Sequence, residues 1–168
     1  MKKPVFTGSA AALVTPFTDR GVDYDRLAAA LDRQAEGGTA AVVVCGTTGE
    51  ASTMTDNEKL ALIAHTVQYC AGRCKVIAGT GTNDTVHAIE KSKAAEAAGA
   101  DALLVVTPYY NKCNSDGLLR HYTALADAVH IPVILYNVPS RTGVHMTPSQ
   151  YAALAKHPNI AGVKEACG

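Results

Sequence analysis

The stretch AVVVCGTTGE at residues 41–50 decides the fold, because a buried strand runs there directly into a polar loop. Its four consecutive apolar residues, three of them β-branched, are typical of a strand that is covered on both faces. The glycine-flanked pair Thr47-Thr48 then offers two hydroxyls and exposed backbone N–H groups, a combination suited to a small carboxylate. Taken alone, this loop would be an ordinary turn, so its meaning depends on the rest of the chain.

The same pattern recurs along the chain at intervals of about thirty residues, with one amphipathic helical pattern between successive apolar runs. Repeated βαβ units produce this alternation. The sequence predicts five helices and six strands, centred on Ala10–Val14, Ala41–Val44, Val76–Ala78, Ala102–Val106, Val133–Leu135 and Ile160–Val163.

The predicted helices have readable ends and inner faces. Thr55 with Glu58, and Thr147-Pro148 with Gln150, form capping boxes at two helix starts. Gly37-Gly38, Gly72 and Gly99 supply left-handed stops. The inner stripes are predicted to be Leu60, Ile63 and Val67 in one helix, and Leu118, Tyr122, Leu125 and Val129 in another.

Polar residues follow nearly every predicted strand, and this separates a β/α barrel from an open sheet. They are Thr15-Pro16, residues 46–50, Gly79-Thr80-Gly81, residues 107–110, Tyr136-Asn137 and Lys164-Glu165. A barrel gathers all of its strand ends around one mouth, whereas an open sheet of nucleotide-binding type carries a glycine-rich loop after its first strand. That loop is missing, and Gly79-Thr80-Gly81 is only half of a nucleotide motif because Asp84 stands in the last glycine's place.

The chain is too short for a complete barrel. The 168 residues fall short of the roughly 250 of a full eight-stranded barrel, so we expect one incomplete domain over residues 1–168, truncated to about six strands and five helices.

Composition excludes several classes of function. Fifteen basic residues balance fifteen acidic ones, so no electrostatic footprint for nucleic acid or an anionic membrane is present. The six histidines show no metal-ligand spacing, and no apolar run approaches the ~18 residues of a membrane span. The five cysteines are odd in number and include no C-x-x-C pair. Together with a start that lacks a signal peptide, they predict reduced thiols in a cytoplasmic protein.

Lys164 and Tyr136 form the candidate catalytic pair. Each ends an apolar run, and the two strands are sequential neighbours whose ends would lie side by side. A desolvated lysine has a lowered pKa and becomes a neutral amine that can attack a carbonyl to form an imine. A nearby tyrosine hydroxyl can move the protons that imine formation requires. Seen singly, the lysine would be a snorkelling strand-end residue and the tyrosine a core residue.

Arg141 lies in the loop Val138-Pro-Ser-Arg-Thr-Gly143 and could bind a second carboxylate through two parallel hydrogen bonds. By itself it would equally be a solvated surface arginine.

These motifs together resemble the dihydrodipicolinate synthase family of pyruvate-dependent aldolases. The resemblance runs from Phe6 to Gly168 and is carried by Gly46-Thr-Thr-Gly-Glu50, Thr107-Pro-Tyr-Tyr-Asn111, Tyr136-Asn-Val-Pro-Ser-Arg-Thr-Gly143 and Gly162-Val-Lys-Glu-Ala166. It implies a β/α barrel, usually a homotetramer, that condenses pyruvate with L-aspartate 4-semialdehyde in lysine and diaminopimelate biosynthesis. No metal or organic cofactor is called for.

The resemblance also implies roles for individual residues. Lys164 matches the Schiff-base lysine. Tyr136, Thr47 and Tyr110 match a proton relay, with Tyr110 expected to come from the adjacent subunit. Thr48 matches the residue that binds the carboxylate of pyruvate, and Arg141 the residue that binds that of the semialdehyde.

Two alternatives remain open at this point. The chain could serve a sister activity, of the N-acetylneuraminate lyase or 2-keto-3-deoxygluconate aldolase type, or it could be an inactive fragment that acts only by association. The resemblance further implies weak or absent inhibition by lysine. Asn83 and Tyr109 of the family's lysine site are retained, but His87 stands where a glutamate is usual and Lys59 where a histidine is usual.

Overall fold

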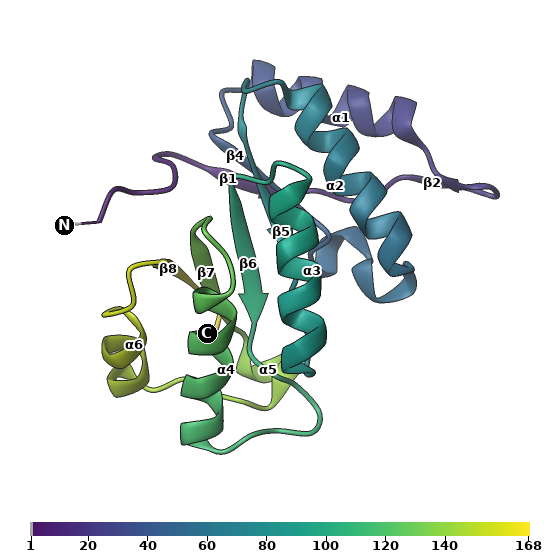
Figure 1. Cartoon of the computed structure of the whole chain (residues 1–168). Coiled ribbons are helices and arrows are strands. Elements are labelled where there is room, and N and C mark those ends of the chain that lie inside the picture. The colour runs from purple at the N-terminus through teal and green to yellow at the C-terminus, as the bar shows by residue number, and fades with distance from the viewer. Residues whose placement is uncertain (1) are drawn as a thin grey trace.

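The computed structural model describes residues 2–168 as a curved parallel sheet with helices along its outer side (Figure 1). The sheet has six strands in the order β1-β4-β5-β6-β7-β8. Their bounds are β1 (Ala10–Ala12), β4 (Ala41–Val44), β5 (Lys75–Gly79), β6 (Ala102–Val106), β7 (Val133–Asn137) and β8 (Ile160–Glu165). The α-helices are α1 (Tyr24–Glu36), α2 (Asp56–Cys70), α3 (Thr85–Ala97), α4 (Ser115–Asp127), α5 (Pro139–Thr142) and α6 (Pro148–Leu154).

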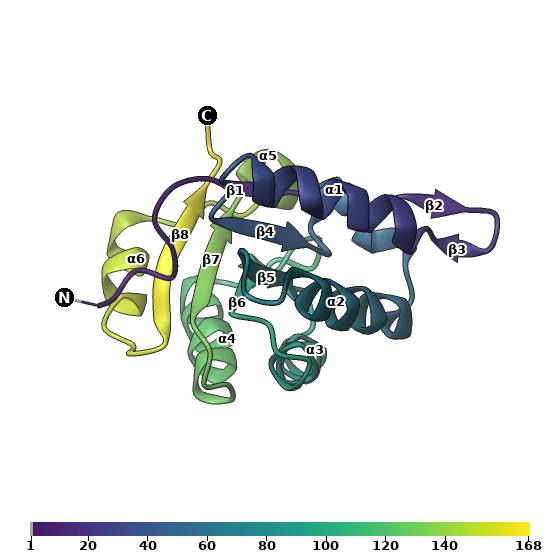
Figure 2. The ribbon, with the colours of Figure 1, turned by 90° about the horizontal axis from the view of Figure 1, so that it is seen from above.

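The sheet has the curvature of a β/α barrel. Seen from above, its strands form an arc, and α1, α2, α3, α4 and α6 lie along the convex side (Figure 2). All five neighbouring strand pairs are parallel. The predicted α/β class, a TIM-barrel fold reduced to six strands, is confirmed for the part of the chain that the structure describes.

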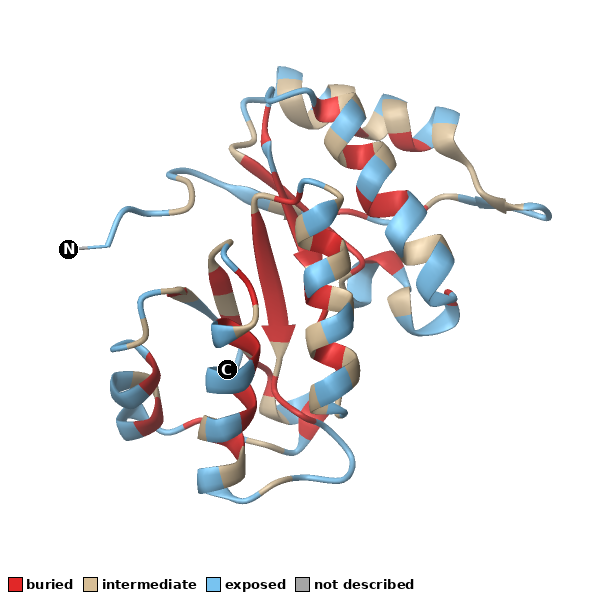
Figure 3. Ribbon diagram, viewed as in Figure 1, coloured by how far each residue is buried: buried red, intermediate tan, exposed pale blue. Residues whose placement is uncertain are grey.

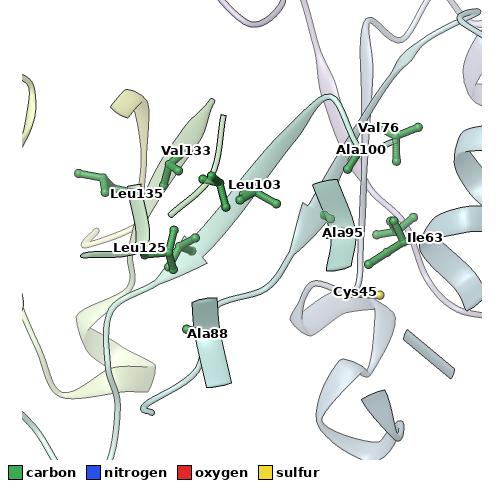
Figure 4. Packing of buried hydrophobic residues seen from close by; sticks show 14 of the residues in the cluster. Cys45, Ile63, Val76, Ala88, Ala95, Ala100, Leu103, Leu125, Val133 and Leu135 are labelled. Atoms are coloured by element: carbon green, nitrogen blue, oxygen red, sulfur yellow. The ribbon is translucent and has the colours of Figure 1, made fainter. Parts of the chain in front are cut away.

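Side chains on the strands alternate between two apolar layers, as the period of two in a β-strand requires. The outer layer packs against the helices and includes Val76, Leu103, Val133 and Leu135 (Figure 4). The inner layer, on the concave face, consists of Ala41, Val43, Ile77, Ala102 and Leu104, with Ile134 and Tyr136 packed against it. Most residues of the central strands are therefore buried, whereas the helices bury one side only (Figure 3).

Both predicted capping boxes are present. The Thr55 side chain accepts from the Glu58 N–H, while the Glu58 carboxylate accepts from the Thr55 N–H at 2.7 Å. Thr147 and Gln150 do the same at the start of α6. The predicted inner stripe of α4 is also correct, because Leu118, Tyr122, Leu125 and Val129 are all buried.

Several local predictions need correction. In the predicted stripe of α2, Ile63 is buried and Val67 packs against the core, but Leu60 is 38% exposed because α2 turns Leu62, Thr66 and Cys70 inward. Gly37 is right-handed, with a φ of −74°, and only Gly38 takes the left-handed conformation at the end of α1. β1 ends at Ala12 rather than Val14.

Besides the 3-10 helices Thr47–Gly49 and Ala51–Thr53, three short elements were not predicted from the sequence. Two are the strands of an antiparallel hairpin, β2 (Phe17–Thr18) and β3 (Gly21–Val22), whose pairing is too short to leave an alternating pattern. The third is α5, a single turn of four residues that begins at Pro139.

Gly79 and Gly81 have a structural explanation that replaces the partial nucleotide motif. A Cβ atom on Gly79 would lie 2.3 Å from the carbonyl oxygen of Cys45, and one on Gly81 would lie 2.4 Å from the backbone nitrogen of Val106. The ends of β4, β5 and β6 therefore approach one another more closely than any side chain would allow.

Candidate active site

A cavity of about 270 Å³ opens where the strands end, and most of the predicted site residues line it. Thr47 and Thr48 reach it from the loop after β4, Tyr136 and Lys164 from β7 and β8, and Arg141 from α5. The expectation that polar residues after successive strands would meet at one mouth is thus correct for these five residues. Tyr110 does not line the cavity, whereas its neighbour Tyr109 does.

Strand register places Lys164 beside Tyr136. The two residues are direct partners in the parallel pairing of β7 with β8, so both project from the concave face. The Lys164 ammonium lies 4.2 Å from the centroid of the Tyr136 ring, in a cation–π arrangement over the ring face. Partial burial, together with the charge of Arg141, lowers the pKa of Lys164. The direction is the one that a nucleophilic amine needs.

Thr47 and Thr48 sit on a short 3-10 turn, Thr47–Gly49, that neighbouring residues hold in place. The hydroxyl of Thr15 donates to the carbonyl of Gly49 at 2.7 Å, and both residues are buried. Within residues 2–168, no hydrogen bond joins Thr47 to Tyr136. The two threonine side chains are exposed to the cavity and remain available to a ligand.

Tyr110 has an unusual environment for a site residue. It is 90% exposed and takes a left-handed φ of 66°, a conformation that is uncommon for residues other than glycine. A large aromatic side chain held out in this way offers its ring and hydroxyl to the surroundings rather than to the cavity.

A hydrogen-bond network around Asn137, at the end of β7, lies next to the segments that carry Arg141 and Lys164. The buried Asn137 side chain donates to Glu165 at 2.8 Å and accepts from the Met146 N–H at 3.1 Å. Tyr151 of α6 donates to the other carboxylate oxygen of Glu165 at 2.5 Å. This network ties the segment after α5 to the residue that follows Lys164. Asn137 and Glu165 were visible in the sequence as neighbours of the site, but their pairing depends on strand register.

Two further cations lie in the cavity wall: Lys59, which the sequence singled out only at the family's lysine site, and Lys91, which it did not single out. Lys59 from α2 and Lys91 from α3 line it together with Lys164 and Arg141, and among residues 2–168 no aspartate or glutamate lines it. Lys91 gave no signal in the sequence, because a lysine within an Ala- and Lys-rich helix is typical of a solvated face.

The described residues contain no cluster of three or more His, Cys, Asp or Glu side chains able to hold a metal ion. His87, His130 and His157 each lie within 3.4 Å of a carboxylate oxygen, as surface histidines commonly do. In the same part of the chain, no helix combines the length and the apolar character that crossing a bilayer requires.

A curved parallel β/α sheet with a lysine of lowered pKa at a strand end defines a barrel protein suited to carbonyl chemistry. Residues 5–168 match the Dihydrodipicolinate synthetase family, and the chain belongs to that family.

Two curated relatives illustrate the match. The 4-hydroxy-tetrahydrodipicolinate synthase of Thermoanaerobacter sp. (strain X514) is 54% identical over 166 residues, which cover 98% of this chain and 56% of the relative. That of Geobacter sulfurreducens is 53% identical over 164 residues, covering 98% of this chain and 57% of the relative. The chain therefore spans somewhat more than half the length of the curated relatives it matches.

Solved structures agree with the fold. The enzyme from Cyanidioschyzon merolae, solved with lysine bound, superposes with a TM-score of 0.95 at 42% identity, covering 99% of this chain and 57% of that one. The enzyme from Acinetobacter baumannii, complexed with pyruvate, gives a TM-score of 0.93 at 48% identity, covering 95% and 55%.

Proposed function

We propose that the protein is a lyase that condenses pyruvate with L-aspartate 4-semialdehyde to give 4-hydroxy-tetrahydrodipicolinate. The observation that carries this proposal is the lowered pKa of Lys164 beside Tyr136, in a cavity whose described lining residues include four cations and no carboxylate. Both substrates bear a carboxylate, so a cationic cavity attracts them. Family membership, and the pyruvate complex of the Acinetobacter baumannii relative, support the same substrate.

The first half of the reaction uses Lys164. Its neutral amine attacks the ketone carbon of pyruvate, and loss of water from the carbinolamine gives an imine. The hydroxyl of Tyr136, with Thr47 and a Tyr110 contributed by an adjacent subunit, relays the protons of these steps. Thr48 binds the carboxylate of pyruvate. The cationic imine then loses a proton from the methyl group to give an enamine.

The second half joins the substrates. The enamine carbon attacks the aldehyde of the semialdehyde, whose carboxylate Arg141 binds. The amino group of the bound semialdehyde then adds to the imine carbon, the bond to Lys164 breaks, and the amine of Lys164 is regenerated. One water molecule leaves per turnover, at imine formation, and no electron acceptor is needed.

Oligomerisation, a cytoplasmic location and a role in lysine and diaminopimelate biosynthesis belong to the same proposal. A tetramer would supply the neighbouring Tyr110, whose 90% exposure in this chain suits a residue that completes another subunit's site. A sister activity on another aldehyde is the second candidate, and Arg141 is the residue that favours the semialdehyde.

Reduction with borohydride in the presence of pyruvate tests the proposal. We expect a mass increase on the peptide that contains Lys164. The Lys164→Arg variant should lose both the adduct and turnover, because arginine stays protonated and cannot form the imine. Lys156→Arg, the same change at an exposed lysine in the turn before β8, is the matched control. Normal turnover by Lys164→Arg would exclude the mechanism.

A further inference from the structure

Two of the four cations in the cavity have no role in the proposed reaction. Lys164 carries the imine and Arg141 binds the second substrate, whereas Lys59 and Lys91 also line the cavity and serve neither purpose. Both side chains are largely buried, with exposures of 14% and 17%. Holding two ammonium groups out of water is unfavourable unless something compensates their charge.

The two ammonium groups lie close to the same carboxylate oxygen, Oδ1 of Asp56. The Nζ atom of Lys59 lies 3.2 Å from Oδ1 of Asp56, and that of Lys91 lies 4.0 Å from the same oxygen. One carboxylate is therefore shared between two lysines. The other carboxylate oxygen of Asp56 lies 2.7 Å from Nε2 of His87. The negative charge of Asp56 is therefore shared among three side chains.

Lys59 and Lys91 line two pockets that differ in the charges around them. The second pocket, of about 260 Å³, is lined by the two lysines together with Asp56, Glu90 and His87, so both signs of charge are present there. The main cavity contains no carboxylate among its described lining residues. The thiol of Cys45 is nearby, but burial raises its pKa to about 11, so it stays neutral at pH 7 and adds no negative charge.

The two lysines also come from a different part of the sheet than Lys164. Lys59 and Lys91 come from α2 and α3, which follow β4 and β5, whereas Lys164 lies on β8, three strands beyond β5 in the sheet. The groups that shift the pKa values agree with this separation. Burial and the charge of Lys59 lower the pKa of Lys91, while burial and Arg141 lower that of Lys164.

We propose that Lys59 and Lys91 form a second anion subsite of the cavity, which binds a carboxylate group of a small organic anion. The bound carboxylate supplies a second negative charge, so that the two ammonium groups no longer share Asp56 alone. The exposed hydroxyl of Ser52, which also lines the cavity, can donate a hydrogen bond to the bound carboxylate. The cavity has room for a molecule of a few carbon atoms. The subsite does not depend on imine chemistry, so binding there can be tested separately from the proposed reaction.

Calorimetric titration with succinate tests the subsite, because succinate has two carboxylates and no carbonyl that could react with Lys164. We expect Lys59→Met/Lys91→Met to weaken succinate binding by roughly tenfold or more for each ammonium lost. Arg141→Met should retain binding within a few-fold. Lys93→Met, an exposed lysine on the same helix, is the matched control and should bind as the parent does. Inorganic phosphate serves as a second probe and should bind more weakly than succinate.

A second measurement covers the case in which the double variant is poorly folded. The NMR titration of the Lys91 side chain in the parent protein should move to higher pH when succinate is present, because a bound anion favours the charged ammonium. Succinate binding that survives the loss of both lysines, or that disappears only with Arg141→Met, would overturn the proposal. Tighter binding of phosphate than of succinate would overturn the assignment to a carboxylate.

Discussion

At the scale of single residues, Arg141 and Lys164 place two positive charges in one cavity, and the charge of Arg141 lowers the pKa of Lys164. Removing Arg141 removes one of the two causes that lower the pKa of Lys164. In the Arg141→Ala variant we therefore expect the pyruvate adduct to form still, but with its pH profile displaced to higher pH. Borohydride trapping across a pH series measures the displacement.

The same variant should discriminate between the two substrates. Loss of a charge-assisted contact costs roughly 1.5–3 kcal/mol, so kcat/KM for the semialdehyde should fall by about 10- to 150-fold. Arg120→Ala, an exposed arginine on α4 paired with Asp116, is the control and should leave both readings unchanged. If the semialdehyde kinetics also stay unchanged in Arg141→Ala, Arg141 is a surface residue and the choice among sister aldolases reopens.

Lys59 and Lys91 also predict how the protein responds to lysine. A ligand's ammonium entering beside them meets two positive charges and only the shared carboxylate of Asp56. We therefore expect weak or no inhibition by L-lysine, measured in a synthase assay with lysine up to millimolar concentrations. Replacing Lys59 with His, the residue usual at this position in inhibited relatives, should increase sensitivity if charge is the cause. Strong inhibition of the parent protein would contradict the prediction.

At the scale of secondary structure, the close approach of strand ends can be tested at Gly79. An alanine there would place its Cβ 2.3 Å from the Cys45 carbonyl, so β4 and β5 must move apart. We expect Gly79→Ala to lower the free energy of unfolding by about 1–3 kcal/mol, as overpacking usually does. Gly46→Ala is the control, because its nearest contact would be an ordinary 3.7 Å and its φ of −83° suits any residue. Equal stability of the two variants in urea would show that the strand ends are not tightly packed.

The network between β7, β8 and α6 predicts a dependence on pH. Hydrogen bonds from Tyr151 and Asn137 lower the pKa of Glu165 below its ordinary value of 4.5. A carboxyl whose pKa is depressed on folding stabilises the protein above its unfolded pKa, and this stabilisation disappears as the pH falls through the folded value. Glu165→Gln should thus be less stable than the parent at pH 7, with the difference shrinking below about pH 4.5. Denaturation at both pH values measures it, and a difference that does not vary with pH would contradict the assignment.

Much of the sheet could be predicted from sequence, because strands buried on both faces leave continuous apolar runs such as Ala41–Val44 and Ala102–Val106, whose bounds the structure reproduces. The position of Lys164 next to Tyr136 followed from strand order alone. Lys91 could not be found in this way. Its role depends on how α3 is rotated against α2, and a polar residue in a helix with little amphipathic pattern does not reveal which side it faces. The error at Leu60 has the same origin.

At the scale of the whole molecule, the sheet formed by residues 2–168 ends in β1 on one side and β8 on the other. Each of these strands has one neighbour within the described residues, so backbone donors and acceptors along its other side are unpaired there. Apolar side chains are uncovered at both ends, since Val14 is 59% exposed and Val163 is 44% exposed. Unpaired edges of this kind pair readily with other chains.

A polypeptide limited to residues 1–168 should therefore associate through these edges and lack synthase activity. Closure of a barrel pairs every strand and buries the residues around its cavity more deeply, and burial is the first cause of the lowered pKa of Lys164. In this polypeptide Lys164 is still exposed, so its ammonium should be more often protonated, and a poorer nucleophile, than in a closed barrel. Sedimentation velocity and a coupled synthase assay on the purified polypeptide test both parts. A monodisperse monomer with substantial turnover would show that six strands suffice to desolvate Lys164, and that closure of the barrel contributes little to its reactivity.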